Sequence, residues 1–217
     1  MKVRDLVNVG YSNVIITSPG GNHVSAINIA KVLNDNQINL IVDGVCFSAC
    51  AQELVLGVNS VNLRKNSLVA FHQSGTFMHL FAKTHMTDKE EYVSHTKKIS
   101  DIEKHFFNEL NIDHNALIVP SEVINYQCFA NEIRFDRGDY FVKFVPTHDW
   151  YVPQKQVLEG WRRREGLVGG IVDQSDFLER TKLFPSLLKS YSFAFGKIRH
   201  TKNIDMYING IEPCEER

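Results

Sequence analysis

The sequence predicts an α/β fold built around a parallel β-sheet, and three features near the N-terminus carry this prediction. Two short runs of aliphatic and β-branched residues, at 13–17 and 38–42, are typical of buried strands. Between them, residues 23–33 place apolar side chains at helical spacing. The order strand, helix, strand defines a β-α-β unit, in which the two strands run parallel with a right-handed crossover.

The same alternation continues along the chain. A turn at 44–49 leads into a helix at 51–56 that ends at Gly57, and strands follow at 60–63 and 67–71. The later predicted elements are, in order, a long charged helix at 87–110, a hairpin at 133–142, a helix at 153–164, a strand at 167–172 and a helix at 175–189. Because no repeat or low-complexity linker interrupts the sequence, we interpret residues 1–217 as one domain.

Composition excludes several classes of function. A chain of 217 residues, 43% of them hydrophobic, can bury a core without a structural metal. A net charge of -1 argues against nucleic acid as the main partner, since phosphate binding needs a concentrated basic field. No run approaches the roughly 18 apolar residues of a membrane span, and no signal peptide is visible. We therefore expect a cytoplasmic protein without a membrane span.

The cysteines allow several interpretations. Four cysteines are too few to indicate a disulfide framework by number. Cys46 and Cys50 flank the predicted turn at 44–49, and we interpret them as small buried thiols. A disulfide, a metal site and a cysteine nucleophile stay open as alternatives. The pair is a poor zinc signature and the histidines lack metal-ligand spacing, so no metal or other cofactor is predicted.

The turn at 44–49 contains the residue that is best placed for nucleophilic catalysis. A catalytic serine needs a sharp, exposed turn, a base that activates its hydroxyl, and backbone N–H groups that face the oxyanion. Ser48 follows a buried strand and precedes a helix, whose N-terminus favours negative charge. Taken alone, Ser48 is more simply a helix N-cap.

Two further segments are expected to lie at the same edge of the sheet as Ser48. Gly20 and Gly21 follow the first predicted strand, and His72 terminates the strand at 67–71. Ligands bind at the carboxyl ends of strands in open α/β sheets, so these residues and Ser48 are expected to lie close together. We predict that His72 is the general base of Ser48, although a histidine at a strand end is often only a polar terminus.

Three motifs, in this order along the chain, resemble the proteolytic subunit of the Clp protease and its relatives. They are Ser18-Pro19-Gly20-Gly21, Gly44-x-x-x-Ser48-Ala49 and Asn66-Ser67-Leu68-Val69-Ala70-Phe71-His72-Gln73. The resemblance covers roughly residues 14–75, and the interval between serine and histidine is close to the family's. The pattern Cys46-x-Ser48-x-Cys50 is more similar to a Clp-protease-like branch of the family than to the housekeeping peptidase. The resemblance implies the spiral of β-α-β units that this family shares with the crotonases, here with a long charged helix and an inserted hairpin.

The resemblance also implies a catalytic triad. Ser48 becomes the nucleophile, His72 the general base and Asp149 the residue that orients the histidine. The implied activity is that of a serine endopeptidase, ATP-independent or dependent on a partner, which cleaves peptide bonds through an acyl-enzyme. A peptide or protein is then the substrate.

The glycine turn gains a role from the same resemblance. The amides of Gly20 and Ala49 become the oxyanion hole, and an extended peptide adds as a strand beside Gly21 and Asn22. A homo-oligomer is also implied, with the long charged helix as its natural interface.

The sequence departs from the family pattern in two ways. The interval from His72 to Asp149 is longer than the family's, as though a hairpin at about 123–147 were inserted, and a C-terminal extension occupies about 175–217. The chain also begins almost at the first strand, without the family's N-terminal elements that dock an ATPase, so an ATPase partner does not carry over.

Three alternatives remain at this point. An acyl-CoA-binding member of the same fold would use the oxyanion hole without a serine nucleophile, and a non-catalytic member would serve as an interaction module. A Ser-Lys dyad would require a lysine near Ser48, for which Lys65 is the nearby candidate in sequence. We interpret the arginines at 162–164 as a solvated helix end.

Overall fold

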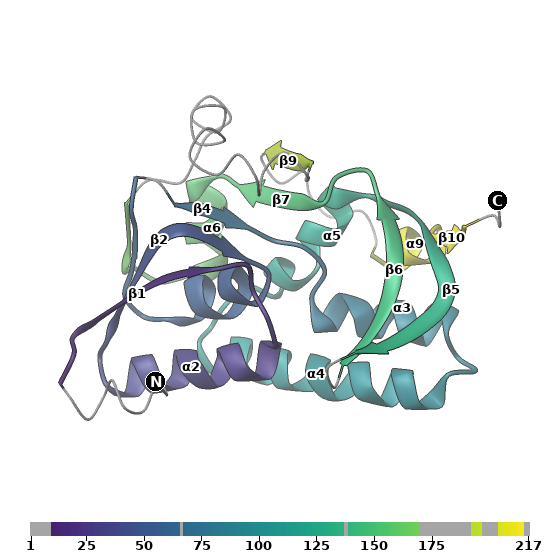
Figure 1. The fold of residues 1–217 in the computed structure, drawn as a ribbon, viewed down its shortest axis with the longest axis horizontal. Coiled ribbons are helices and arrows are strands. Elements are labelled where there is room, and N and C mark those ends of the chain that lie inside the picture. Colours follow the sequence, from purple (N-terminus) through teal and green to yellow (C-terminus); the bar gives the residue numbers. More distant parts are fainter. Residues whose placement is uncertain (1–9, 66, 137–138, 170–191, 197–203, 215–217) are drawn as a thin grey trace.

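The structure is a computed structural model that describes residues 10–65, 67–136, 139–169, 192–196 and 204–214 (Figure 1). Within these ranges, the side chains at 131–141 and at 196 are outside the description. The predicted helix at 175–189 and the end of the predicted strand at 167–172 also lie outside the described residues.

A parallel sheet of five strands forms the centre of the fold, which confirms the α/β class. Its strands are β1 (Asn13–Ser18), β2 (Asn39–Phe47), β3 (Val61–Leu63), β4 (Leu68–Ala70) and β8 (Leu167–Gly169). The long strand β2 pairs with β1 on one side; on the other side its first half pairs with β3 and its second half with β4. The carboxyl ends of β1, β2 and β4 therefore meet at one edge.

Helices cover this sheet and fill the space around it. They are α2 (His23–Asp35), η1 (Cys50–Val55), α3 (Gly75–His85), α4 (Glu90–Glu109), η2 (His114–Leu117), α5 (Val119–Ile124), α6 (Lys155–Arg162) and α9 (Ile204–Asn209). Figure 1 shows α2 and the long α4 along the same side of the sheet. Helix α3, which the sequence analysis missed, begins at a side-chain cap in which the Ser74 hydroxyl accepts from the Phe77 N–H.

The predicted hairpin is present and is longer than expected. Strands β5 (Tyr126–Asp136) and β6 (Asp139–Pro146) pair antiparallel, and the short β10 (Glu212–Pro213) adds to β5. The hairpin packs on α3 through an aromatic cluster, in which the Phe81 ring lies 4.8 Å from the rings of Phe129 and Phe144. A separate pair joins β7 (Trp150–Pro153) and β9 (Phe193–Gly196) in parallel.

The start of the predicted turn at 44–49 is instead part of β2. The strand passes through Gly44, whose φ is 111°, and continues to Phe47. The irregularity is a bulge, because the register of β1 against β2 shifts between Ile16 and Ser18. The Thr17 hydroxyl accepts from the Val45 N–H at 3.2 Å and so replaces a ladder hydrogen bond. The chain consequently turns only at Ser48.

Candidate active site

Ser48 lies at a strained turn between β2 and η1. Its φ is 55°, in the left-handed region that non-glycine residues rarely adopt. Two backbone hydrogen bonds hold it there: the Ser48 N–H donates to Ala70 O at 3.1 Å, and the Ser48 carbonyl accepts from Gln52 N at 2.9 Å. Gly20 packs so closely that an added Cβ would lie 2.5 Å from the Ser48 Cβ. The predicted meeting of Gly20 with the serine is therefore observed.

The Ser48 hydroxyl is hydrogen-bonded to Nε2 of His72, just beyond the end of β4. The opposite ring nitrogen, Nδ1, lies 2.9 Å from Oε1 of Gln73. An amide oxygen can only accept, so Nδ1 carries the proton and Nε2 presents a lone pair to the serine. This is the tautomer that a general base for Ser48 requires.

Gln73 is itself held by Tyr126 at the start of the hairpin. The Tyr126 hydroxyl donates to Oε1 of Gln73 at 2.6 Å, and the Tyr126 N–H donates to the hydroxyl of Tyr207 in α9 at 2.9 Å. Burial raises the pKa of Tyr126, which keeps its hydroxyl a neutral donor. Neither Gln73 nor Tyr126 was predicted from the sequence; the place of Gln73 directly after His72 was the one signal available.

Within the part of the chain that the structure describes, no hydrogen bond joins Asp149 to His72. Its carboxylate accepts from the N–H of Ser192 at 2.7 Å and from the hydroxyl of Ser192 at 2.9 Å. The place predicted for Asp149 is taken by Gln73, because the chain after the hairpin brings Trp150 rather than the aspartate against the imidazole, with the two rings 4.8 Å apart.

The surroundings of His72 keep its ring neutral. Burial lowers the pKa of His72 to about 4; the nearby positive charge of His23 lowers it further, while the hydrogen bond to Gln73 acts in the opposite direction. A neutral imidazole can accept a proton, so His72 is in its basic form at neutral pH.

The predicted oxyanion hole is only partly prepared. The Gly20 N–H donates to the Ser18 hydroxyl at 3.1 Å. Ala49 precedes the first turn of η1, where a helix leaves N–H groups without intrahelical partners. Asn22, predicted to contact substrate, caps α2: its side chain accepts from Ser25 N at 2.9 Å. Gly21, at φ 150°, has open space around its Cα, as a substrate-facing position needs.

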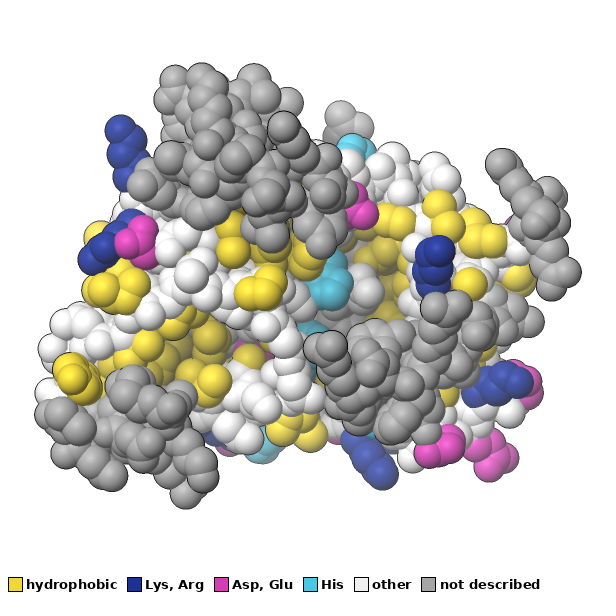
Figure 2. Space-filling model, in the orientation of Figure 1, with side chains coloured by type: hydrophobic (Ala, Val, Ile, Leu, Met, Phe, Trp, Pro, Cys, Tyr) yellow, Lys and Arg dark blue, Asp and Glu magenta, His cyan; other side chains and the backbone are white. Residues whose placement is uncertain are grey.

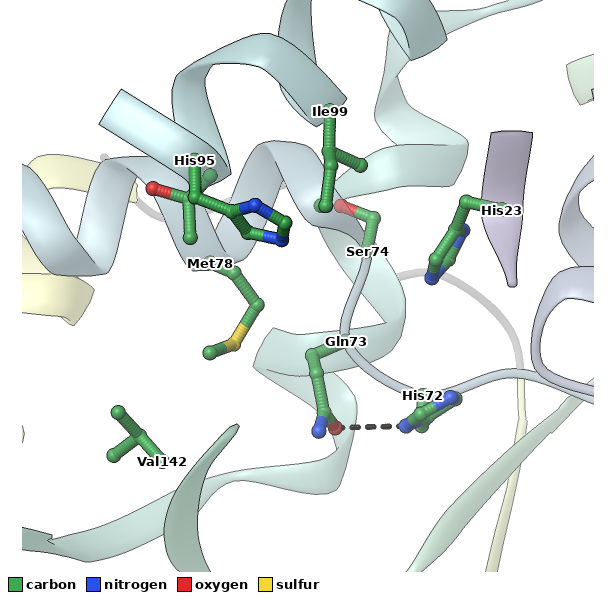
Figure 3. A pocket seen from close by; sticks show the side chains of 10 residues that line it. His23, His72, Gln73, Ser74, Met78, His95, Ile99 and Val142 are labelled. Carbon is green, nitrogen blue, oxygen red and sulfur yellow. Dashed lines mark hydrogen bonds between the residues drawn. The ribbon is translucent and has the colours of Figure 1, made fainter. Parts of the chain in front are cut away.

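A pocket of about 100 Å³, open to solvent on one side, adjoins the imidazole of His72. Its remaining lining comes from α2, from the start of α3, from α4 and from the hairpin: His23, Gln73, Ser74, Gly75, Met78, His95, Thr96, Ile99 and Val142. Figure 3 shows Met78 and His95 together on one side of the pocket and His23 on the other. Figure 2 shows histidine side chains near the middle of this face, between groups of hydrophobic side chains.

His23 also belongs to a buried charged cluster behind the pocket. Its Nδ1 lies 2.8 Å from Oε1 of Glu53 and 3.1 Å from Oε1 of Glu103, and both glutamate side chains are fully buried. Burial raises the pKa of Glu53 to about 7, against the lowering effect of His23. Glu103 caps α3 by accepting from the N–H groups of Gly75 and Thr76.

This cluster is the arrangement among the described residues whose ligand atoms are close enough to hold a metal ion. Local ligand spacing in the sequence does not reveal the cluster, because its members come from three different helices. The two oxygens of Glu103 already accept from helix α3, so the chain's own donors compete with any cation.

All four cysteines are paired in disulfides, so the prediction of buried thiols is wrong. Cys46 is bonded to Cys50, and Cys128 to Cys214. The first pair spans the Ser48 turn, and the second joins β5 to the C-terminal segment. Among the described residues, no helix combines the length and the apolar character needed to cross a membrane.

Of the three arginines predicted to be a solvated helix end, Arg163 is half exposed, but Arg162 and Arg164 instead hold the far end of η1. Arg162 is fully buried and donates to the carbonyls of Val55, Val58 and Asn59. Arg164 donates to Leu56 O at 2.7 Å. Two positive side chains at the C-terminal end of the helix that follows Ser48 satisfy carbonyls that would otherwise have no partner.

Comparison with protein-family models, with curated proteins and with solved structures returned no match to this chain.

Proposed function

We propose that this protein is a serine hydrolase in which Ser48 is the nucleophile and His72 is the general base. The observation that carries the proposal is the hydrogen bond between the Ser48 hydroxyl and Nε2 of His72, made from a turn with φ 55°. A serine in ordinary helix-capping geometry would bond to backbone N–H groups rather than to an imidazole. Strain of this kind often concentrates at functional sites.

The proposed reaction is acyl transfer. His72 takes the proton of Ser48 as the hydroxyl attacks a carbonyl carbon, and the resulting imidazolium then protonates the leaving group. Water hydrolyses the acyl-enzyme, with His72 again as the base. Gln73 holds the ring through Nδ1, as Asp149 was expected to do. Since Gln73 is neutral, it orients the ring but stabilises the imidazolium less than a carboxylate would.

The oxyanion would be held by the amides of Gly20 and Ala49. The Gly20 amide is engaged by the Ser18 hydroxyl, so substrate binding must turn that hydroxyl away before Gly20 can donate to the oxyanion. The amide of Ala49, at the N-terminal end of η1, needs no such change. An oxyanion-hole donor typically contributes about 10²–10³ in rate, so this rearrangement matters for activity.

The pocket beside His72 supports a substrate with an apolar side chain next to the reacting carbonyl. Met78, Ile99 and Val142 supply apolar surface, and Thr96 and His95 give a polar edge. An extended peptide is the substrate we favour, because the carboxyl ends of β1 and β2 flank the Gly21 turn, where a strand can be added. A homo-oligomer remains part of the proposal.

The test is covalent labelling with a fluorophosphonate, which reacts with activated serines. Wild-type protein is expected to be labelled at Ser48, as located by peptide mass spectrometry, and Ser48→Ala to lose the label while keeping its circular-dichroism spectrum. Ser94→Ala, at an exposed serine of α4, is the matched control. Hydrolysis of peptides with an apolar residue before the scissile bond is expected in wild type and in Ser94→Ala, and is expected to be lost in Ser48→Ala. Equal labelling of Ser48→Ala and wild type would reject the proposal.

A further inference from the structure

The Cys46–Cys50 disulfide encloses the proposed nucleophile. The two cysteines are four residues apart in sequence, with Ser48 midway between them and their Cα atoms 5.2 Å apart. Cys46 lies near the end of β2, and Cys50 is the first residue of η1. The bond therefore ties the strand that enters the Ser48 turn to the helix that leaves it.

This turn needs such a brace because its centre is strained. A left-handed φ of 55° at a serine is less favourable than an ordinary strand or helix conformation. The turn's two backbone hydrogen bonds, to Ala70 O and from Gln52 N, each hold one side of Ser48. The disulfide is the covalent link that fixes both sides relative to each other.

Burial distinguishes a brace from a reactive disulfide. Cys46 and Cys50 are 0% and 2% exposed and belong to the hydrophobic core. Exchange with an external thiol requires that a thiolate reach one of the sulfurs. In the folded protein neither sulfur is open to such attack, so the pair is suited to holding geometry rather than to chemistry of its own.

We propose that the Cys46–Cys50 disulfide is a positioning element, which holds the Ser48 hydroxyl against His72 and is needed for full reactivity of the serine. This inference rests on the proposed hydrolase function. Forming the bond removes two electrons and two protons from the two thiols, and thiol–disulfide exchange with an oxidised partner such as glutathione disulfide can accept them. The site is then complete in an oxidising compartment, where disulfides persist, and not in the cytoplasm that the sequence analysis predicted.

The experiment compares two variants that each lack one disulfide. Cys46→Ala/Cys50→Ala removes the brace without adding a buried hydroxyl, and Cys128→Ala/Cys214→Ala removes the distant bond. We expect the maximal rate of fluorophosphonate labelling at Ser48 to fall by about tenfold or more in the first variant and by less than about threefold in the second. The probe concentration at half-maximal rate should stay unchanged in the first variant, because the pocket is built by other elements.

The outcomes separate the two proposals. If wild-type protein is not labelled at Ser48, the hydrolase proposal fails. If wild type is labelled and Cys46→Ala/Cys50→Ala is labelled equally fast, the hydrolase proposal stands and the positioning role is wrong.

A second measurement covers the case in which the brace variant does not fold. In the Cys128→Ala/Cys214→Ala background, Cys46–Cys50 is the remaining disulfide. This protein is unfolded in urea and refolded with or without a phosphine reductant, and each form is labelled. A portion of the reduced form that has not been labelled is unfolded again, refolded with glutathione disulfide and then labelled. Slow labelling of the reduced form and recovery after reoxidation are expected; equal labelling in both redox states would overturn the inference.

Discussion

The two disulfides of this protein join regions of very different kinds. Cys46 and Cys50 are separated by four residues and bracket the Ser48 turn, whereas Cys128 and Cys214 are separated by 86 residues and join the hairpin to the C-terminal segment. In the chain-entropy model, closing the short loop stabilises a protein by about 2 kcal/mol and closing the long one by about 4–5 kcal/mol. The bond that contributes least to stability thus lies closest to the proposed chemistry.

The comparison shows that one disulfide constrains the geometry of the Ser48 turn, whereas the other is expected to contribute more to the stability of the whole fold. The Ser48 turn is built by residues that are close in sequence and by the parallel sheet. The C-terminal segment stabilises the hairpin, and it reaches the site through the N–H of Tyr126, which donates to the hydroxyl of Tyr207. Tyr126 then contacts Gln73, so one hydrogen-bonded chain connects the two regions.

The largest expected effect is on stability. Cys128→Ala/Cys214→Ala should lose about 4–5 kcal/mol in the free energy of unfolding, because the unfolded chain gains the freedom of a long loop. Cys46→Ala/Cys50→Ala should lose about 2 kcal/mol. Urea denaturation followed by circular dichroism measures both. A larger loss in the short-loop variant would reverse the comparison.

Arg162→Met comes next, with an expected loss of about 3 kcal/mol, since it leaves three carbonyls without a donor at the end of η1. Arg163→Met is the matched control. Its side chain is half exposed and pairs with Asp113 at the surface, so it should cost less than about 1 kcal/mol. Urea denaturation compares them, and equal losses would contradict the capping role of Arg162.

Glu53 and His72 are expected to make the stability of the protein depend on pH in opposite directions. The pKa of Glu53 rises from 4.5 to about 7 on folding, so between these values the unfolded state holds fewer protons and stability falls as pH rises. The pKa of His72 falls from 6.5 to about 4, so between these values stability rises with pH. The two contributions oppose each other from pH 4.5 to 6.5.

Replacing either residue should therefore uncover the dependence of stability on pH that the other residue contributes. Relative to wild type, Glu53→Gln should gain stability as pH rises from 4.5 to 6.5, and His72→Gln should lose it, each by up to about 3 kcal/mol. Urea denaturation at several pH values gives the slopes. Slopes of the same sign in the two variants would show that the burial of one of these groups is wrongly assigned.

The smallest expected effects concern the partner of His72. Gln73→Ala should slow labelling of Ser48 by about tenfold to a hundredfold, equivalent to about 1.4–2.7 kcal/mol, because the ring loses its Nδ1 partner. Tyr126→Phe should slow it by about threefold to tenfold, because Gln73 loses one of its donors. Asp149→Ala should change the rate by less than about threefold. A greater loss of labelling rate in Asp149→Ala than in Gln73→Ala would show that Asp149, rather than Gln73, orients His72.

Much of the fold could be predicted because its signals are local. The β-α-β unit follows from aliphatic runs separated by a segment of helical periodicity, and the hairpin follows from β-forming residues on both sides of a glycine. The boundaries of β2 could not be predicted in this way. Gly44 is typical of a turn, yet its neighbours continue to pair with β1 and β4, and Gly44 forms only a bulge.

By itself, the sequence determined that Ser48, His72 and Gly20 meet, because each follows a strand of one parallel sheet and the carboxyl ends of such strands share an edge. Only the tertiary structure decided which residue orients His72, since the position of residues 149–150 depends on how the chain returns from the hairpin. The same holds for the pairing of the cysteines and the burial of Arg162, where the partners are distant in sequence or hidden by packing. Contacts of this kind leave no local periodicity for the sequence to show.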